Sequence, residues 1–347
     1  MIATAEQEVS SLQARFLPEV RECLRSVVPD SDSGFFGLLR FHLGWEDAAG
    51  NPANEDSGKS LRPVLCLAAC DMAGGDWQAA MPAAAALELV HNFSLIHDDI
   101  QDGDTTRRGR ATLWTVRGIP AAVAAGNAMR VVADQTLAAL ADTGMRPSLA
   151  VLASVELTHR YLEMIEGQYM DMSFEQAEHV TVDEYLDMIG RKTGALIESA
   201  LFLGALAGSG DPDAARSFGR CGRKLGLAFQ VRDDYLGVWG NPKATGKAVG
   251  ADIRRKKKAL PVLYMLEQAT PADMQWITPA LSEPEVSEAN VERVLDLLDR
   301  LDARKYVQSV AEAQAEEALA AVSELSLPPG AEQKLNAMAK FFVTRQK

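Results

Sequence analysis

The stretch Leu87-Glu88-Leu89-Val90-His91-Asn92-Phe93-Ser94-Leu95-Ile96-His97-Asp98-Asp99 is mostly apolar and ends in carboxylates. It contains neither Gly nor Pro and is long enough for more than three helical turns. Asp98 and Asp102, four residues apart, therefore share one face of the predicted helix. Two like charges at this spacing destabilise a helix by roughly 0.2–0.5 kcal/mol unless a cation neutralises them. Oxygen ligands of this kind suit Mg²⁺, and the alternative is a solvated acidic helix end.

A second pair of aspartates, Asp233-Asp234, lies in another apolar helical pattern much further along the chain. Basic residues follow the first cluster at Arg107-Arg108 and precede it in Gly58-Lys59-Ser60-Leu61-Arg62-Pro63. Each short basic segment taken alone is typical of surface charge. Cations beside metal-binding carboxylates are nevertheless what a polyphosphate requires, so the combination predicts a site for a diphosphate.

Several separate segments resemble the trans-isoprenyl diphosphate synthases of the polyprenyl synthetase family, and they occur in the family's order. The residues 58–63 are similar to the family's GKxxRP segment, and 88–91 supply an ExxH. The family's first aspartate motif is matched by His97-Asp98-Asp99-Ile100-Gln101-Asp102, and its second by Phe229-Gln230-Val231-Arg232-Asp233-Asp234. The other similar segments are 107–109, Gly167-Gln168 with Asp171, 191–194, 245–247 and 257–261. Together they span residues 58–261 of the 347.

The resemblance implies a condensation between isopentenyl diphosphate and an allylic diphosphate, assisted by Mg²⁺, with three ions per active site. Its metal ligands would be Asp98, Asp102 and Asp233. The residues implied in ionisation of the allylic diphosphate are Asp98, Asp99, Asp102, Arg107, Lys192, Asp233 and Lys247, with Thr193 and Gln230 as further polar contacts. Isopentenyl diphosphate needs its own anion pocket, for which the family's pattern implies Lys59, Arg62, His91, Arg108 and Lys257.

One departure from the family's pattern affects the metal site. Where the family often has a third aspartate in the second motif, this chain reads Asp233-Asp234-Tyr235-Leu236-Gly237. Gly237 has no side chain to offer, and Gly within a helix costs about 1 kcal/mol relative to Ala. We expect metal binding to persist with Asp233 as the main ligand, and a water or Asp234 to replace the missing carboxylate.

Product length depends on the helix that precedes Asp98. Ser94 lies one turn before Asp98 and Val90 two turns before it, and both leave room for a growing chain. Phe93, five residues before the first motif, resembles the aromatic residue of short-chain synthases, although helical geometry alone places it off the Asp98 face. The resemblance implies geranylgeranyl diphosphate as the product, and farnesyl or geranylfarnesyl diphosphate as alternatives.

Two other functional classes share parts of this pattern. A terpene cyclase of related helical fold would ionise a long diphosphate but would have no use for Lys59, Arg62 and His91. A non-catalytic subunit of a heteromeric synthase would be expected to lose aspartates of the first motif, and these are all present. Both observations favour the prenyltransferase.

The composition favours an all-α fold, because Ala and Leu are abundant and alternating β-branched residues are scarce. Long windows at 121–141 and 152–174 predict helices. Breaks between helices are predicted at 29–33, 44–58, 175–181, 208–212, 237–250, 270–271 and 328–330. No linker separates the motifs, so we expect one domain over residues 1–347, a helical bundle of the isoprenoid synthase type around a central cavity. Residues 237–258 are typical of a lid over the diphosphates.

The remaining features concern partners and location. The 35 basic and 48 acidic residues give a net charge of −13, which disfavours nucleic-acid binding by the basic run 254–258, where only Lys257 is expected to serve the site. No run of eighteen apolar residues occurs, and the N-terminal segment 1–28 is an acidic amphipathic pattern without a signal peptide's core, so we expect no stable membrane anchor. Four cysteines without zinc spacing predict a reduced, cytoplasmic protein. The resemblance implies a homodimer.

Overall fold

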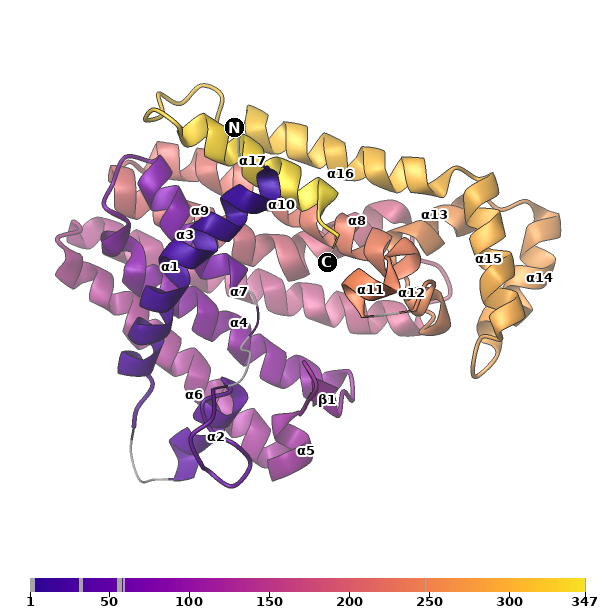
Figure 1. The fold of residues 1–347 in the computed structure, drawn as a ribbon, viewed down its shortest axis with the longest axis horizontal. Helices are drawn as coiled ribbons and strands as arrows, with labels where there is room; N and C mark the ends of the chain where they lie inside the picture. Colours follow the sequence, from indigo (N-terminus) through magenta and orange to yellow (C-terminus); the bar gives the residue numbers. More distant parts are fainter. Residues whose placement is uncertain (1–3, 31–33, 55–57, 59, 247, 347) are drawn as a thin grey trace.

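The structure is a computed structural model that describes residues 4–30, 34–54, 58, 60–246 and 248–346. Helices make up nearly all of its regular structure, which confirms the all-α prediction (Figure 1). Within the described residues the only paired strands form a short antiparallel hairpin. In chain order the elements are α1 (Ala5–Val27), α2 (Gly34–His42), α3 (Leu61–Met72), η1 (Trp77–Ala80), α4 (Met81–Gln101), β1 (Thr106–Arg107), β2 (Arg110–Ala111), α5 (Leu113–Arg117), α6 (Ile119–Ala138), η2 (Ala139–Thr143), α7 (Pro147–Gln176), α8 (Val182–Ile189), η3 (Gly190–Gly194), α9 (Ala195–Ser209), α10 (Pro212–Trp239), α11 (Pro242–Thr245), α12 (Ala251–Arg254), α13 (Leu260–Gln268), α14 (Pro271–Ser282), α15 (Glu288–Arg300), α16 (Ala303–Ala320) and α17 (Ala331–Thr344).

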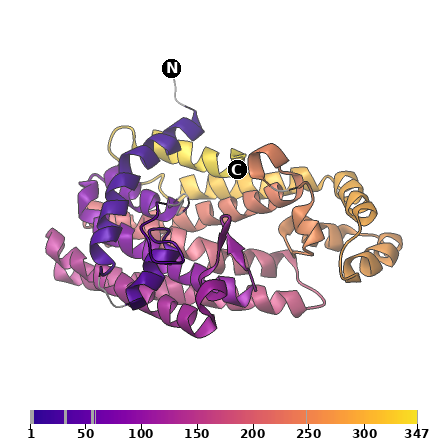
Figure 2. The same ribbon diagram turned by 60° about the horizontal axis from the view of Figure 1, so that its bottom comes forward.

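Helix α9 lies at the centre of the bundle. It is apolar on all sides, as a helix buried within a core must be. It packs against α3, α4, α7 and α10, while α16 and α17 cover the other side of α10. Helix α1 packs against α17, so the first and last helices are neighbours, whereas α14 and α15 project from the far end (Figures 1 and 2).

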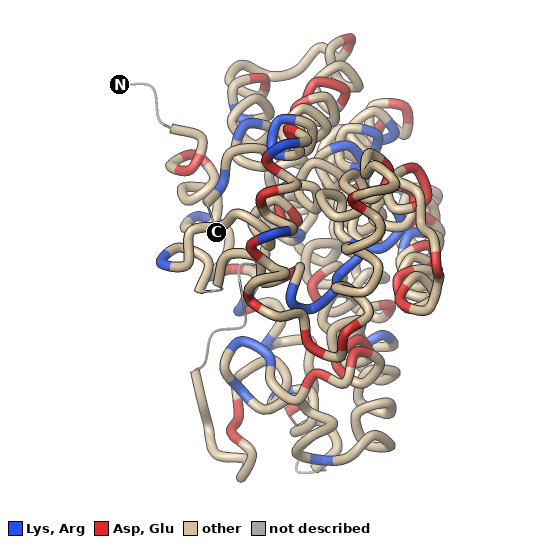
Figure 3. Tube along the Cα trace, turned by 90° about the vertical axis from the view of Figure 1, so that its right-hand side faces the viewer, with Lys and Arg blue, Asp and Glu red and all other residues tan. Residues whose placement is uncertain are grey.

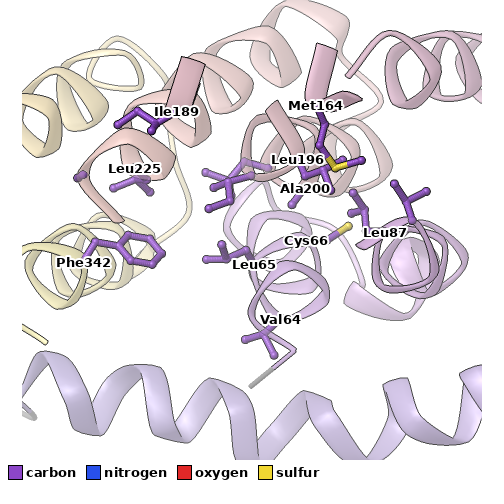
Figure 4. Packing of buried hydrophobic residues seen from close by; sticks show 14 of the residues in the cluster. Val64, Leu65, Cys66, Leu87, Met164, Ile189, Leu196, Ala200, Leu225 and Phe342 are labelled. Carbon is purple, nitrogen blue, oxygen red and sulfur yellow. The ribbon is translucent and has the colours of Figure 1, made fainter. Parts of the chain in front are cut away.

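The contact between α3 and α9 is unusually close. A Cβ atom on Gly204 of α9 would lie 2.0 Å from the carbonyl oxygen of Cys66 on α3, so only glycine fits there. Figure 4 shows Cys66 and Leu65 of α3 packed beside Leu196 and Ala200 of α9. Cys66 and Cys70 are fully buried, which agrees with the expectation that these two cysteines are packing residues. Burial raises the pKa of both thiols, that of Cys70 to about 12.

Helix α4 carries the first aspartate motif out of this core. The continuous helical stretch Trp77–Gln101, with a mean hydropathy of 1.3, is long and apolar enough to cross a membrane by length and composition alone. However, 67% of the relevant window is buried inside the protein, and the stretch packs against α3, α6 and α9. It is therefore the core helix that positions the carboxylates at its end.

The predicted helices at 121–141 and 152–174 correspond to α6 and α7, and the N-terminal pattern corresponds to α1. The breaks predicted at 175–181 and 208–212 contain the ends of α7 and α9, and residues 31–33 of the break predicted at 29–33 lie outside the described residues. The break predicted at 237–250 begins three residues later than predicted, because α10 continues through Gly237 to Trp239. Gly237 and its neighbours Leu236 and Val238 are buried, and this packing offsets a helical propensity cost of about 1 kcal/mol.

Candidate active site

The carboxyl end of α4 faces α7 and the short segment η3 across a cavity of about 360 Å³, which we call the first cavity. One side of it is polar and carries Asp98, Lys192 and Thr193. The rest is largely apolar, so a charged group and a hydrocarbon would both find suitable surroundings. Its lining residues are Arg62, His91, Phe93, Ser94, Leu95, His97, Asp98, Gln101, Met164, Ile165, Gln168, Tyr169, Met172, Lys192 and Thr193.

Asp98 carries a carboxyl group whose ionisation is disfavoured. Burial raises its pKa to about 7, and although Lys192 opposes this shift, the nearby Asp102 adds to it. Burial also raises the pKa of Asp102 itself, whose carboxylate lies 3.5 Å from the amide nitrogen of Gln168. Two such carboxyl groups on one face of α4 form an acidic pair that a further cation would stabilise.

Asp99 lies on a different side of α4. It is buried, with 2% of its side chain exposed, and accepts a hydrogen bond of 2.6 Å from Nε of Arg107. It does not line the first cavity, so in this structure the Asp99 carboxylate holds Arg107 rather than facing the space where a ligand would bind. Arg107 itself lies on β1, in the hairpin that follows α4.

Lys192 and Thr193 lie on a π-helical turn, η3, between α8 and α9. Insertions of this kind often occur at functional sites. Lys192 forms an ion pair with Asp171 of α7, and Thr193 donates a hydrogen bond of 3.0 Å to Gln230 of α10. Arg223 of α10 holds this turn by donating a hydrogen bond to the carbonyl oxygen of Gly190. Its Nη2 atom lies 2.7 Å from Glu163 of α7, and its Nε atom lies 2.5 Å from Glu198 of α9.

A second cavity, of about 380 Å³, adjoins the first and shares Arg62 and His91 with it. Arg108 also lines it, as do Glu88, Phe229 and Arg345. Burial lowers the pKa of Arg62, and burial together with Arg62 and Arg108 lowers the pKa of His91 well below its ordinary value. His91 is therefore neutral beside two guanidinium groups, an arrangement suited to binding an anion.

The two aspartates of the second motif point in different directions. Asp234 is fully buried, where its carboxylate accepts hydrogen bonds from the Tyr185 hydroxyl, the backbone N–H of Leu260 at 3.2 Å and the Gln230 amide at 3.3 Å. Asp233 is half-exposed and pairs with Arg345 near the end of the chain. The carboxylate of Asp234 therefore links α8, α10 and α13 through these hydrogen bonds. This disagrees with the expectation that Asp234 replaces the missing third aspartate as a metal ligand.

Most side chains of the basic run at 254–258 form ion pairs or hydrogen bonds with other residues of the chain. Arg254 pairs with Glu288, Lys256 donates to the carbonyl oxygen of Glu283, and Lys258 donates to two carbonyl oxygens at the end of α7. Lys257 alone reaches the second motif, with its Nζ atom 3.3 Å from Asp234. Figure 3 shows acidic and basic residues interleaved over this end of the molecule.

The three residues expected to control product length are placed differently. Phe93 and Ser94 line the first cavity, whereas Val90 is fully buried and is not among its lining residues. The ring of His97 stacks edge-on against Phe93 with centroids 5.3 Å apart. Phe93 reaches the cavity even though helical spacing alone placed it off the Asp98 face.

Two of the expected diphosphate-binding lysines, Lys59 and Lys247, lie outside the described residues. Conversely, the structure places three residues beside the site that sequence reasoning did not single out: His42, Arg223 and Arg345. His42 lies among Arg107, Arg108 and Asn92, and burial followed by these arginines lowers its pKa to about 3. None of these three residues lies in a recognisable sequence motif, so the sequence contains no signal by which to find them.

The carboxylates of this site fit a divalent cation that a ligand helps to bind. Among the described residues, no three His, Cys, Asp or Glu side chains form a ready-made metal cluster. The oxygen ligands stand instead on two sides, Asp98 and Asp102 at the end of α4 and Asp233 on α10. Mg²⁺ commonly takes only one or two carboxylates and completes its coordination with waters and substrate phosphates, so this donor set suits it.

The helical fold and the two adjoining cavities, one beside carboxylates and one lined by arginines, define an all-α protein with a site for anionic ligands. A family model for polyprenyl synthetases matches residues 47–298. A farnesyl diphosphate synthase from Mycobacterium tuberculosis is 34% identical over 326 residues, 93% of this chain and 89% of that protein. A geranylgeranyl diphosphate synthase from the same organism is 38% identical over 292 residues, 84% and 82% of the two chains. A crystal structure of a polyprenyl synthetase from Streptomyces coelicolor matches with a TM-score of 0.90 and 35% identity, over 97% of this chain and 100% of that one.

The chain belongs to the polyprenyl synthetase family, and it is a trans-prenyltransferase. The relatives include both farnesyl and geranylgeranyl diphosphate synthases at similar identity, so family membership fixes the type of reaction and not the length of the product.

The raised pKa of Asp98 predicts how the stability of the metal-free protein depends on pH. Between the ordinary pKa of an aspartate and the value of about 7 in the folded state, the folded protein holds a proton that the unfolded chain has lost. The free energy of unfolding should therefore fall as pH rises from about 4 to about 7, and Asp98→Asn should show a smaller fall. Urea unfolding in excess chelator measures both slopes, and equal slopes would contradict the assignment.

Proposed function

We propose that the protein condenses isopentenyl diphosphate with an allylic diphosphate and that its main product is geranylgeranyl diphosphate. The observation that carries this proposal is the pair of adjoining cavities, one acidic and apolar and the other cationic, which share Arg62 and His91. Two diphosphates with different fates need two such environments. The names of the relatives support the substrate class, and the geranylgeranyl product rests on the placement of Phe93 and Ser94.

Ionisation of the allylic diphosphate would take place in the first cavity. Bound Mg²⁺ would neutralise the leaving diphosphate, and Asp98, Asp102 and Asp233 are the residues that would hold it. Lys192, held by Asp171, and Arg107, held by Asp99, would add fixed positive charge beside the same group. The apolar lining beyond Phe93 would exclude water from the carbocation, and Thr193 and Gln230 would contact the leaving group.

Isopentenyl diphosphate would bind in the second cavity, where its diphosphate must stay attached. Arg62 and Arg108 would neutralise it, and the neutral His91 would donate a hydrogen bond. On the family's pattern, Lys59 and Lys257 would also bind this diphosphate and Lys247 would bind the leaving diphosphate. The double bond would then attack the allylic cation at the boundary of the two cavities, and the released diphosphate would remove the proton.

The direct test is incubation with Mg²⁺, labelled isopentenyl diphosphate and allylic primers of five, ten and fifteen carbons, followed by sizing of the products. We expect incorporation, and Asp98→Ala should lower turnover by about 100-fold or more because it removes stabilisation of the leaving group. Asp142→Ala, at an exposed position on η2, serves as the control. A hydrocarbon or alcohol formed from a preformed long diphosphate, without incorporation, would identify a cyclase instead.

Product length should respond to the ring of Phe93. Phe93→Ala opens the apolar part of the first cavity and is expected to shift the product towards more than twenty carbons, measured by chromatography of the dephosphorylated prenols. Val90→Ala, which removes atoms from a buried residue outside the cavity lining, is the matched control and should leave the length unchanged. If only the control changes the product, the floor of the cavity lies elsewhere on α4.

We further propose that the protein is a homodimer joined through α6 and α7. The outer face of α7 exposes five large apolar residues at helical spacing: Val151, Val155, Leu162, Ile165 and Tyr169, with exposed fractions of 63%, 46%, 52%, 44% and 69%. Ile119, Val123 and Val131 of α6 add to this face. A continuous apolar surface of this kind is typical of an interface. Because Ile165 and Tyr169 also line the first cavity, a second copy would close that flank.

Leu162→Glu should separate the two copies, because it would bury an unpaired charge in the centre of the interface. Light scattering coupled to size exclusion would then report one chain where the unmodified protein reports two. Val249→Glu places the same charge on an exposed apolar residue away from α6 and α7 and should leave the dimer intact. An unmodified protein that runs as a single chain would refute the dimer directly.

A further inference from the structure

The backbone of η3 is in direct contact with two neighbouring helices. The turn continues from α8 and runs into α9 without interruption. A Cβ atom on Gly167 of α7 would lie 2.3 Å from the backbone nitrogen of Lys192. A Cβ atom on Gly226 of α10 would lie 2.6 Å from Cα of Gly194. No side chain fits at position 167 or 226 unless the turn moves, so α7 and α10 together determine where its backbone lies.

Four charged side chains form a closed ring of ion pairs beside this turn. Arg223 of α10 lies 2.7 Å from Glu163 of α7 and 2.5 Å from Glu198 of α9. Arg160 of α7 lies 3.0 Å from the same Glu163 and 2.7 Å from the same Glu198. Each of the four side chains is at most 26% exposed, and none of the four lines the first or the second cavity. The ring therefore lies outside the site and joins α7, α9 and α10 next to η3.

Arg223 connects this ring to the turn. Its Nη1 atom donates a hydrogen bond to the carbonyl oxygen of Gly190, the residue at which η3 begins. A guanidinium group is planar, and its N–H donors point in fixed directions. Because Glu163 and Glu198 already hold two of its nitrogens, the third can point in only one direction. The ring therefore fixes the position of the Gly190 carbonyl group, two residues before Lys192.

The turn in question carries two residues of the site. Lys192 and Thr193 line the first cavity, whereas the preceding Arg191 pairs with Glu166 and Asp187 at the surface. A π-helical turn holds one more residue than an α-helical turn, and successive residues of an α-helix point about 100° apart. If η3 returned to α-helical spacing, the side chains on one side of the insertion would rotate by about this angle. Such a rotation would turn side chains of η3 away from the cavity.

We propose that Arg223 is a positioning residue for the diphosphate in the first cavity: it keeps η3 π-helical through the carbonyl group of Gly190, so that Lys192 and Thr193 face the ligand. The proposal rests on the proposed function, which places an allylic diphosphate in that cavity. Arg223 itself does not touch the ligand. Its effect on binding passes through the two residues that the turn carries.

The alternative is that the ring of ion pairs only stabilises the fold. Under that alternative, Arg223→Gln would lower the free energy of unfolding and leave the affinity of the folded protein for diphosphate unchanged. Arg160 still contacts both Glu163 and Glu198 in this variant, so the two carboxylates remain paired and the variant should fold. The proposal requires a loss of affinity in the folded variant.

The experiment measures Mg²⁺-dependent binding of inorganic diphosphate by calorimetry, which does not depend on turnover. Arg223→Gln is expected to lower the affinity by about tenfold, the effect of one lost hydrogen bond to a charged group. Arg216→Gln removes an exposed arginine from the same helix and should leave the affinity unchanged. A folded Arg223→Gln variant that binds diphosphate as tightly as the unmodified protein would overturn the proposal.

A double variant tests whether Arg223 acts through the turn. Lys192→Ala alone should weaken binding, and adding Arg223→Gln to it should weaken binding by no more than about threefold further, a non-additive result. Additive losses would mean that Arg223 acts independently of Lys192 and would overturn the proposal. Lys192→Ala that binds diphosphate normally would instead contradict the proposed function, which places the diphosphate beside Lys192, and the inference would be lost with it.

Gly167→Ala disturbs the same turn from α7 and leaves all the ion pairs in place. It is also expected to weaken diphosphate binding by about tenfold, and unchanged binding by the folded variant would show that the position of the turn does not matter. In turnover, Gly167→Ala and Arg223→Gln should raise the KM for the allylic diphosphate and not that for isopentenyl diphosphate, because Lys192 and Thr193 line only the first cavity. Equal rises in both KM values would indicate a general structural effect and refute the positioning role.

Discussion

Repulsion among the carboxylates at the end of α4 is the constraint on which the site depends. Asp98, Asp99 and Asp102 lie within five residues, and Asp99 and Asp102 raise the pKa of Asp98 in addition to the effect of burial. The helix cannot move to relieve this repulsion, because α3, α6 and α9 pack against it. The protein instead places fixed cations nearby, Arg107 from the hairpin and Lys192 from the π-helical turn. The apolar core thus determines the geometry of a charged site.

The two cavities follow from the same arrangement. The first lies beside the carboxylates and is otherwise apolar, which suits a diphosphate that leaves and a hydrocarbon that grows. The second gathers arginines around a neutral histidine and suits a diphosphate that stays. Arg62 and His91 belong to both, so the two diphosphates would be close enough for their carbon atoms to react. Separate environments and a shared boundary are what a condensation of two similar substrates needs.

Sequence reasoning could predict those features that depend on spacing along one helix, such as the shared face of Asp98 and Asp102 and the helices α6 and α7. It could not predict the π-helical turn under Lys192, because that insertion is held by Arg223 from another helix. Neighbouring residues such as Asp233 and Asp234 point about 100° apart on a helix, and only the packing of α8 and α13 decides which one is buried. Arg345 approaches the site from the distant end of the chain without a recognisable motif. The break expected from Gly237 begins only after Trp239, because burial outweighed a weak local preference.

The buried thiols have a practical consequence for following motion in this protein. Cys66, Cys70 and Cys221 are buried, and Cys23 is half-buried with a pKa that burial raises, so none presents a reactive thiolate. The native cysteines should therefore react only slowly with maleimide or nitroxide labels. One cysteine introduced on the surface of α12 and another on α7 would carry a spectroscopic pair that reports the distance across the site. A change in the distance between α12 and α7 when a ligand is added can then be measured in solution without first removing any native cysteine.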